Sequence, residues 1–262
     1  MNILSQITLG KYKEVEERKE MVTLKSLENS EFFGRNTVSL KNALENSNGK
    51  HGIIAEFKRK SPSKGIFSEK FEPVAIAKSY VEAGATALSI LTDGPYFGGS
   101  SEDLMAVRRT QNVPILRKDF MVDEYQMVEA KAWGADVVLL IAAAIDSALL
   151  NRLAKFAKSL GLETLLEIHE IQELEGNLSE YIDIVGVNNR NLKDFTVDIE
   201  RSIRAVEHIP AHFTRISESG ISRPETITHL KGFGYKGFLM GEAFMQTPSP
   251  EYAIRKFVEA LQ

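Results

Sequence analysis

The sequence predicts an α/β protein built as a (β/α)8 TIM barrel with an extra N-terminal helical segment. After residue 50, short apolar runs recur eight times at intervals of roughly 20–35 residues, and helical patterns fill the gaps between them. The runs are apolar almost throughout, which is typical of parallel strands that helices cover on both faces. Eight such units without a change in composition favour a closed barrel.

The predicted strands are short segments that are rich in β-branched and other apolar residues. They are GIIAEFK (52–58), ALSILT (87–92), VPILRKDF (113–120), ADVVLLIA (135–142), ETLLEI (163–168), IDIVGVNN (182–189), HFTRISE (212–218) and GFLMGE (237–242). A doubly wound, Rossmann-like sheet is the alternative, but it needs a glycine-rich phosphate turn after an early strand. The first strand instead leads into KRKSPSKG (58–65), so we prefer the barrel.

Helical periodicity marks the segments between these strands. The predicted helices include PVAIAKSYVEAGA (73–85), SEDLMAVRRTQ (101–111), EYQMVEAKAWGA (124–135), SALLNRLAKFAKSLG (147–161) and RPETITHLKGFG (223–234). Glycine in the left-handed conformation commonly closes a helix. Four glycines are predicted to do so here: Gly84, Gly134, Gly161 and Gly234.

Residues 1–47 have a different character, because they are charged and helical in pattern. In GKYKEVEERKEMV (10–22), acids and bases recur at three- and four-residue spacing, which predicts a solvated helix face. We therefore expect a single (β/α)8 barrel domain over residues 1–262, with a helical extension over 1–47 and the barrel over 48–262.

Composition narrows the range of functions. A formal net charge of −4 argues against nucleic acid as a partner. The chain has no cysteine, which excludes disulfides, thiolate metal sites and cysteine nucleophiles. The longest apolar run, VVLLIAAAI (137–145), is far shorter than the about 20 residues of a membrane span, and the N-terminus lacks the pattern of a secretory signal. We expect a cytoplasmic protein with neither nucleic acid nor membrane as a partner.

Polar residues stand at the C-terminal ends of six predicted strands, where a (β/α)8 barrel builds its active site. A charge at one strand end is usually a solvated loop boundary, but six such ends together favour a shared cavity, because buried charges need partners or a ligand. Residues two apart on a strand share a face, so Glu56 and Lys58 point the same way, as do Asn188 and Arg190. The strand-end residues are Glu56, Lys58, Lys118, Asp119, Glu167, Asn188, Arg190, Glu218, Ser219, Gly241 and Glu242.

Small residues after the last two strands predict a phosphate site. Ser219 and Gly220 lie in ISESGIS (216–222), and Gly241 and Glu242 lie in FLMGEAF (238–244). In this fold, backbone N–H groups after the seventh and eighth strands commonly bind phosphate. An acid beside a phosphate is unfavourable, so we expect only the backbone N–H of Glu242 to face the anion.

Other site chemistries receive less support from the residues. The five histidines (51, 169, 208, 212 and 229) have no metal-ligand spacing such as HExxH, so no metal site is predicted; His169 is a candidate for the rim of the cavity. Two carboxylates, Glu56 and Glu167, do not by themselves indicate a glycoside hydrolase, because the basic residues among them favour an anionic substrate. Lys118 as a Schiff-base lysine stays open.

Taken in order, the strand-end motifs resemble those of the indole-3-glycerol-phosphate synthase family of tryptophan biosynthesis. The resemblance covers about residues 50–247 and includes IAEFKRKSPSKG (54–65), LSILTDGPYFGGS (88–100), PILRKDF (114–120), LLEIHE (165–170), VGVNNRNL (185–192), SESGIS (217–222) and FLMGEAF (238–244). It implies a lyase that closes the ring of 1-(2-carboxyphenylamino)-1-deoxyribulose 5-phosphate to give indole-3-glycerol phosphate, CO₂ and water, without a cofactor. Phosphoribosylanthranilate isomerase is the rival, but its cysteine base has no counterpart here.

The resemblance also implies roles for individual residues. Lys118 is implied to be the general acid that protonates the ketone oxygen during ring closure. Glu167 and Glu56 are the carboxylate candidates for dehydration, and Lys58 is either a second acid or a ligand of a substrate anion; the choice among these stays open. The other implied positions are Asn188 and Arg190 for orientation, Ser61 for the substrate carboxylate, Phe97 and Phe120 as walls of the ring site, and Ser219, Gly220, Gly241 and Glu242 for the phosphate.

Three further expectations concern the loops, one strand and the assembly. The turn SPSKG (61–65) is expected to be a mobile lid over the substrate. Arg215 puts a charge inside the seventh strand and needs a partner if it faces the barrel. The chain is expected to be a monomer or a weak homodimer, and a non-catalytic phosphate-binding barrel is the alternative from another functional class.

Overall fold

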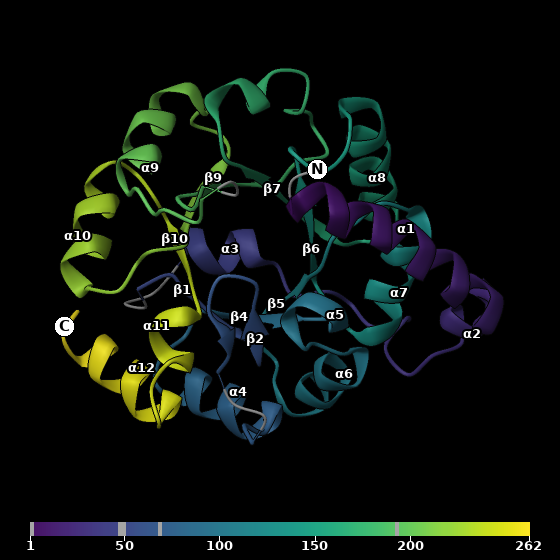
Figure 1. The fold of residues 1–262 in the computed structure, drawn as a ribbon, viewed down its shortest axis with the longest axis horizontal. Helices are drawn as coiled ribbons and strands as arrows, with labels where there is room; N and C mark the ends of the chain where they lie inside the picture. Colours follow the sequence, from purple (N-terminus) through teal and green to yellow (C-terminus); the bar gives the residue numbers. More distant parts are fainter. Residues whose placement is uncertain (1–2, 47–50, 68–69, 192–193) are drawn as a thin grey trace.

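The computed structural model describes residues 3–46, 51–67, 70–191 and 194–262. Within them, eight parallel strands close into a barrel, in which the last strand pairs back with the first (Figure 1). The predicted (β/α)8 barrel is therefore confirmed. Its strands are β1 (Ile53–Phe57), β4 (Ala87–Leu91), β5 (Ile115–Lys118), β6 (Val137–Ile141), β7 (Glu163–Ile168), β8 (Ile184–Asn188), β9 (Thr214–Glu218) and β10 (Gly237–Met240).

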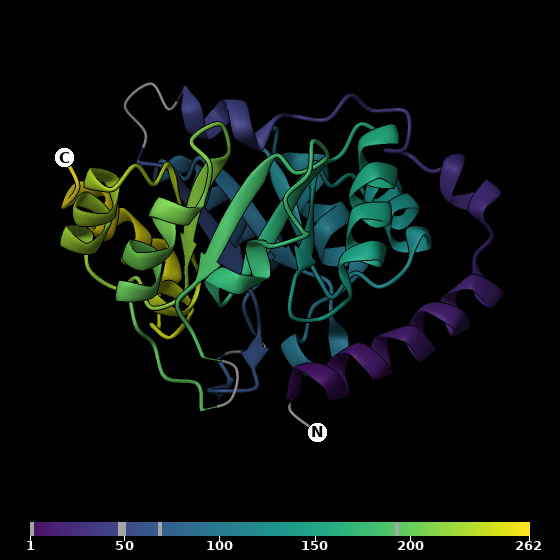
Figure 2. The same cartoon turned by 90° about the horizontal axis from the view of Figure 1, so that it is seen from above.

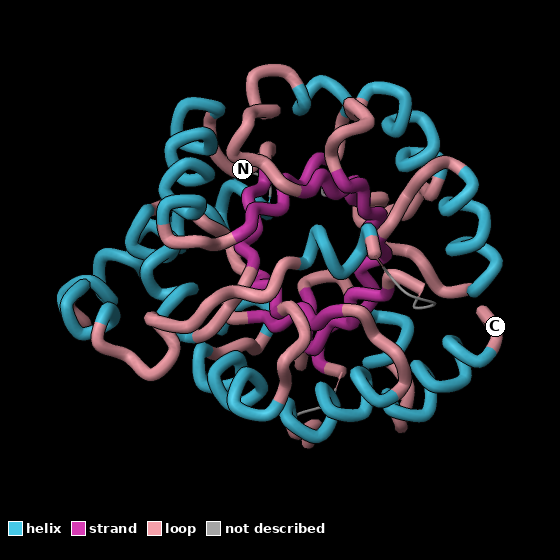
Figure 3. Tube along the Cα trace, turned by 180° about the vertical axis from the view of Figure 1, so that it is seen from behind, coloured by secondary structure: helices cyan, strands magenta, loops and turns pink. Residues whose placement is uncertain are grey.

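Helices surround the barrel, and all five that the periodicity predicts are present (Figures 1 and 3). They are α4 (Pro73–Glu82), α6 (Ser101–Thr110), α7 (Glu124–Trp133), α8 (Ser147–Ser159) and α10 (Pro224–Gly232). The four closing glycines are all left-handed, with φ between 75° and 103°. The sequence reading did not single out α5 (Gly94–Phe97), η1 (Ile171–Leu174), α9 (Glu200–Ala205), η2 (Val206–His208), α11 (Glu242–Met245) or α12 (Pro250–Glu259).

The loop after β1 forms a small hairpin. Its two strands, β2 (Lys60–Ser61) and β3 (Gly65–Ile66), pair antiparallel, so the expected lid turn is the tip of a hairpin. The motif VGVNNRNL (185–192) begins within β8, and its last residue, 192, lies outside the described residues.

The N-terminal segment contributes three helices: α1 (Ile3–Met21), α2 (Leu24–Glu28) and α3 (Leu40–Glu45). Figure 2 shows α3 at one end of the barrel and the start of α1 at the other. Leu40 and Leu44 of α3 pack into the apolar interior of the barrel and close its N-terminal mouth. The expected boundary between residues 47 and 48 lies outside the described residues.

The prediction of a solvated face on α1 is wrong in part. Glu16 and Glu17 are exposed, but Val15 packs on α7 and Lys11 is 1% exposed. Charged residues at three- and four-residue spacing give the same sequence pattern when they face solvent and when they pair with buried charges on another element. The pattern therefore could not distinguish the two cases. The partners of Lys11 are described below.

Strand alternation separates two faces of the sheet. Side chains such as Ile54, Leu116 and Leu165 fill the barrel interior, and their neighbours in sequence pack outward against the helices. Arg215 is an outward residue, because Ile216 points inward; its guanidinium donates to the carbonyl of Ile209. On each strand, the residue two positions after such an interior residue points inward as well. It lies at the C-terminal mouth of the barrel, where the polar strand-end residues are found.

Candidate active site

A cavity opens at the C-terminal ends of the barrel strands, and every site residue predicted from the sequence lines it. Four of those residues lie on β1, β5, β7 and β8, and the others lie on the segments that follow β1, β4, β5, β8, β9 and β10. The set comprises Glu56, Lys58, Ser61, Phe97, Lys118, Phe120, Glu167, Asn188, Arg190, Ser219, Gly220, Gly241 and Glu242. His169, the candidate for the rim, lines the cavity as well.

Lys118 lies at the centre of the charged residues. Its Nζ is 2.8 Å from Glu167 Oε2 and 2.9 Å from Glu218 Oε2. Burial alone disfavours the charged ammonium, but the two carboxylates outweigh burial and raise the pKa of Lys118 far above its ordinary value. Lys118 is therefore held as an ammonium in the cavity.

Glu167 is held as an anion. Burial opposes its charge, but Lys118 and His169 favour the charge, and the pKa of Glu167 is lowered. Asn188 Nδ2 also donates to Glu167 Oε1 at 2.9 Å, so each carboxylate oxygen has a donor. His169 Nε2 lies 3.4 Å from the same Oε1. Asn188 therefore helps to fix the orientation of this carboxylate.

The pKa of Glu218 is shifted in the opposite direction to that of Glu167. Burial raises its pKa to about 7, and although Lys118 counteracts this effect, the nearby anions Glu167 and Glu56 add to it. Its Oε2 contacts Lys118, whereas its buried Oε1 has no hydrogen-bond partner among the described residues. The sequence placed Glu218 at a strand end but assigned it no role. Its poised carboxylate can accept or release a proton near neutral pH.

Glycine at position 186 makes room for Glu218. A Cβ added at Gly186 of β8 would lie 2.3 Å from Glu218 Oε1, which is closer than real Cβ atoms come to an oxygen. Glycine on the neighbouring strand therefore leaves room for the Glu218 carboxylate in the position that it occupies here.

Glu56 and Lys58 share the inner face of β1 and the loop after it, as their spacing predicted. Lys58 Nζ lies 2.7 Å from Glu56 Oε1, and the Ser89 hydroxyl donates to Glu56 Oε2 at 3.3 Å. Both oxygens of Glu56 thus have donors, in contrast to Glu218.

One end of the cavity is aromatic and apolar. The rings of Phe97 and Phe120 have their centroids 6.1 Å apart, and Ser61 lines the cavity beside them. Helix α1 adds three apolar side chains that the sequence analysis did not place in the site: Ile3, Leu4 and Ile7. A flat apolar ring fits such walls.

The other end carries the loops expected to bind phosphate. Ser219 and Gly220 are both left-handed, with φ of 66° and 75°. Glu242 does not turn away from the charged groups: its carboxylate lies 2.9 Å from Arg190 Nη2 and 3.8 Å from Lys64 Nζ. The Arg190 guanidinium thus offsets the charge of Glu242, and its backbone N–H donates to Asn188 Oδ1 at 3.0 Å.

Asp119 also lines the cavity, but its carboxylate is bound by other side chains of the protein. It contacts Lys11, Arg117 and Thr92, which belong to a network between the barrel and α1. Among the described residues, no group of three His, Asp or Glu side chains has the arrangement of a metal site. No helix in the same part of the chain is long and apolar enough to cross a membrane.

Comparison with known proteins gives a consistent match over the whole barrel. The family model described as "Indole-3-glycerol phosphate synthase" matches residues 4–257. Curated proteins of that name include one from Bacteroides thetaiotaomicron, 47% identical over 100% of this chain and 99% of that protein. Another, from Laribacter hongkongensis, is 42% identical over 97% of each chain.

Solved structures show the same fold at much lower sequence identity. The 3-hexulose-6-phosphate synthase from Salmonella typhimurium superposes with a TM-score of 0.62 at 14% identity, over 80% of this chain and 98% of that chain. KGPDC from Streptococcus mutans gives a TM-score of 0.61 at 14% identity, over 80% and 96% of the two chains. These two likenesses concern the fold alone.

Proposed function

The chain belongs to the indole-3-glycerol phosphate synthase family, and we propose that the cavity at the strand ends carries out the reaction of that family. Enzymes of this name are carboxy-lyases of tryptophan biosynthesis. The substrate is 1-(2-carboxyphenylamino)-1-deoxyribulose 5-phosphate, and the products are indole-3-glycerol phosphate, CO₂ and water. The observation that carries the proposal is the buried ammonium of Lys118 between Glu167 and Glu218, inside the cavity at the strand ends.

Ring closure needs an acid at the ketone. The ring carbon that bears the carboxylate attacks the ketone carbon, and the carbonyl oxygen takes up a proton as the C–C bond forms. Lys118 is the proposed donor, because its raised pKa keeps it protonated and its Nζ faces the cavity. Glu167, itself oriented by Asn188, fixes the ammonium in place.

Loss of CO₂ then restores the aromatic ring, and dehydration completes the indole. This last step needs an acid for the departing hydroxyl and a base for a ring or nitrogen proton. We assign the base to Glu218, because its pKa is raised and its Oε1 is free of hydrogen bonds within the described residues. Glu56 is the weaker candidate, since Lys58 and Ser89 occupy both of its oxygens; Lys58 is the proposed second acid.

The two ends of the cavity would bind the two ends of the substrate. Phe97 and Phe120 would flank the anthranilate ring, with Ser61 near its carboxylate. The backbone of Ser219–Gly220 and of Gly241–Glu242 would bind the phosphate. The charge of Glu242 is offset by Arg190, so it does not oppose the phosphate at full strength.

A Schiff-base aldolase is the alternative for Lys118, and the electrostatics disfavour it. A nucleophilic lysine needs a lowered pKa, but two carboxylates raise the pKa of Lys118. A non-catalytic barrel is disfavoured because the cavity places an ammonium, Lys118, 2.9 Å from a carboxylate with a raised pKa, Glu218, as acid–base chemistry requires. We further propose that the enzyme works in the cytoplasm as a monomer or weak homodimer.

The proposed function is tested by incubating the purified protein with the substrate and following indole fluorescence. We expect product to accumulate with equimolar CO₂ and without added metal or cofactor. A well-folded protein that binds a substrate analogue in calorimetry but forms no indole would be the non-catalytic barrel instead.

Substituting alanine for Gly186 should disable the site without a change in any charged residue. The added methyl group would meet Glu218 Oε1 and force the carboxylate to shift, so we expect kcat to fall about tenfold. The matched control is Gly232→Ala in α10, where an added Cβ meets nothing within 4 Å and activity should be unchanged. Equal kinetics for the two variants would show that the position of Glu218 does not matter.

The pH profile should show the titration of Glu218. Its carboxylate has to be ionised to accept a proton, so kcat/KM should fall as the pH drops through about 7, approaching tenfold per pH unit. In Glu218→Gln, the rate should be low and kcat/KM should no longer fall at low pH. The control is Glu225→Gln, which replaces an exposed residue of α10 and should keep the wild-type pH profile. An acid limb that persists unchanged in Glu218→Gln would assign it to another group.

A further inference from the structure

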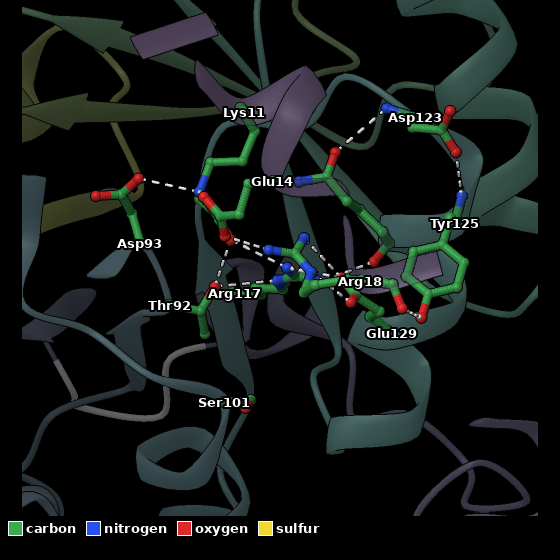
Figure 4. Close-up of polar contacts among 12 residues, drawn as sticks. Lys11, Glu14, Arg18, Thr92, Asp93, Ser101, Arg117, Asp123, Tyr125 and Glu129 are labelled. Atoms are coloured by element: carbon green, nitrogen blue, oxygen red, sulfur yellow. Dashed lines mark hydrogen bonds and ion pairs between the residues drawn. The ribbon is translucent and has the colours of Figure 1, made fainter. Parts of the chain in front are cut away.

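A buried charge network lies between α1 and the barrel (Figure 4). At its centre is Lys11, which is 1% exposed. Its Nζ lies 3.0 Å from Asp93 Oδ2, 3.0 Å from Asp119 Oδ1 and 2.8 Å from Glu14. Asp93 and Asp119 are 1% and 2% exposed. One cation of α1 therefore bridges two carboxylates from separate strand ends of the barrel.

Each of these carboxylates also binds the backbone of one aromatic wall. Asp119 Oδ1 accepts from the Phe120 N–H at 2.8 Å. Asp93 Oδ1 caps the short helix α5 and accepts from the N–H groups of Tyr96 and Phe97 at 2.8 and 3.3 Å. Lys11 is thus linked through one carboxylate to Phe120 and through the other to Phe97, the two rings proposed to flank the substrate.

The helix that carries this lysine also contributes to the wall of the cavity. Ile7 lies one helical turn before Lys11 in α1 and lines the cavity, as do Ile3 and Leu4. A single ion-pair centre therefore connects α1, α5 and the residues after β5, which together enclose the ring site.

The two aspartates that contact Lys11 differ in how much their negative charge depends on this lysine. Asp119 has a second cation, Arg117, whose Nη2 lies 3.0 Å away, and the pKa of Asp119 is lowered despite its burial. Asp93 pairs with Lys11, and burial still raises its pKa, with Asp119 adding to the rise. Loss of the Lys11 charge would leave Asp93 as a buried anion close to a second anion. It would then have to take up a proton or move, and α5 would move with it.

We propose that Lys11 is a positioning residue for the aromatic-ring site: its ammonium sets the spacing of Phe97, Phe120 and the apolar face of α1. This inference rests on the proposed function, because it takes the ring between the phenylalanines to be the anthranilate ring. Lys11 itself does not line the cavity, so its effect should fall on binding of the ring rather than on proton transfer.

The test is Lys11→Met, which removes the charge and keeps the length of the side chain. We expect KM to rise about tenfold while kcat stays within about twofold. In calorimetry, the affinity for anthranilate should fall about tenfold, whereas the affinity for inorganic phosphate should not change. The matched control is Lys13→Met on the same helix, whose side chain is 82% exposed, and it should match the wild type.

A second variant separates positioning from general loss of structure. Adding Asp93→Asn to Lys11→Met removes the unpaired carboxylate but keeps an oxygen to cap α5, so it should restore most of the lost affinity for anthranilate. The proposal is overturned if Lys11→Met leaves KM unchanged, weakens anthranilate and phosphate equally, or is not rescued by Asp93→Asn. The anthranilate measurement does not require turnover, so a wild-type protein that forms no indole would refute the function and still test Lys11.

Discussion

Replacing Lys118 with methionine is expected to lower kcat by about 10²–10⁴-fold, which is the usual contribution of a positioned general acid. Methionine fills nearly the same space but cannot donate a proton to the ketone oxygen. It also removes the cation from between Glu167 and Glu218, so their pKa values should rise. The measurement is steady-state kinetics by indole fluorescence, with circular dichroism to establish that the variant folds.

The control for this variant is Lys236→Met, an exposed lysine before β10, which should retain full activity. Breaking a buried ion pair costs about 3–5 kcal/mol, so some loss of thermal stability is expected in Lys118→Met alone. A folded Lys118→Met protein with wild-type kcat would remove the proposed mechanism, since no other group within the described residues is assigned to protonate the ketone.

Glu167→Gln is expected to reduce kcat by about 10²-fold or more while the protein stays folded. Glutamine keeps the shape and can still contact Asn188, but it removes the negative charge that holds the Lys118 ammonium and favours its protonated form. The loss should therefore fall mainly on kcat, because Glu167 acts through the lysine in the chemical steps. Kinetics at saturating substrate measures it.

Glu170→Gln provides the comparison for Glu167. This acid lies three residues further along, its side chain is 62% exposed, and its contact with Arg201 is a surface ion pair of small energetic value. It should behave like the wild type. If both substitutions had equally small effects, the carboxylate beside Lys118 would have no special part in the reaction.

Most of the fold could be predicted because its signal is local and repeated. Strands buried on both faces read as apolar runs such as VVLLI of β6, and the helices between them end in left-handed glycines such as Gly134. The shorter elements could not be predicted in the same way. Helix α5 has four residues and is held by the Asp93 cap, and the β2–β3 hairpin pairs two residues with two.

The site could be predicted to the extent that it follows from strand alternation. Glu56, Lys118 and Glu167 each lie two residues after an interior residue of the same strand. Those interior residues are Ile54, Leu116 and Leu165. Strand alternation therefore predicts that the three charged side chains point into the same cavity. The pKa values of the side chains within the cavity cannot be predicted from strand alternation. The raised pKa of Glu218 depends on its burial and on its distances to three charged neighbours, and both are known only from the folded structure.

The contribution of α1 was not visible in the sequence for a different reason. Lys11 belongs to a run of alternating charges that is typical of a solvated helix, and its partners, Asp93 and Asp119, lie more than 80 residues away in the chain. Only the docking of α1 on the barrel brings them together. The apolar pair Leu4 and Ile7 on the same helix was the available signal, since they recur at a spacing that places them on one face.

The most direct test of the central claim is a crystal structure of the protein with a substrate analogue in which the ketone is reduced to an alcohol. We predict that Lys118 Nζ lies within hydrogen-bond distance of the alcohol oxygen, with the ring between Phe97 and Phe120 and the phosphate at Ser219–Gly220. An analogue bound with its phosphate at the opposite end, or with its alcohol oxygen out of reach of Lys118, would contradict the account.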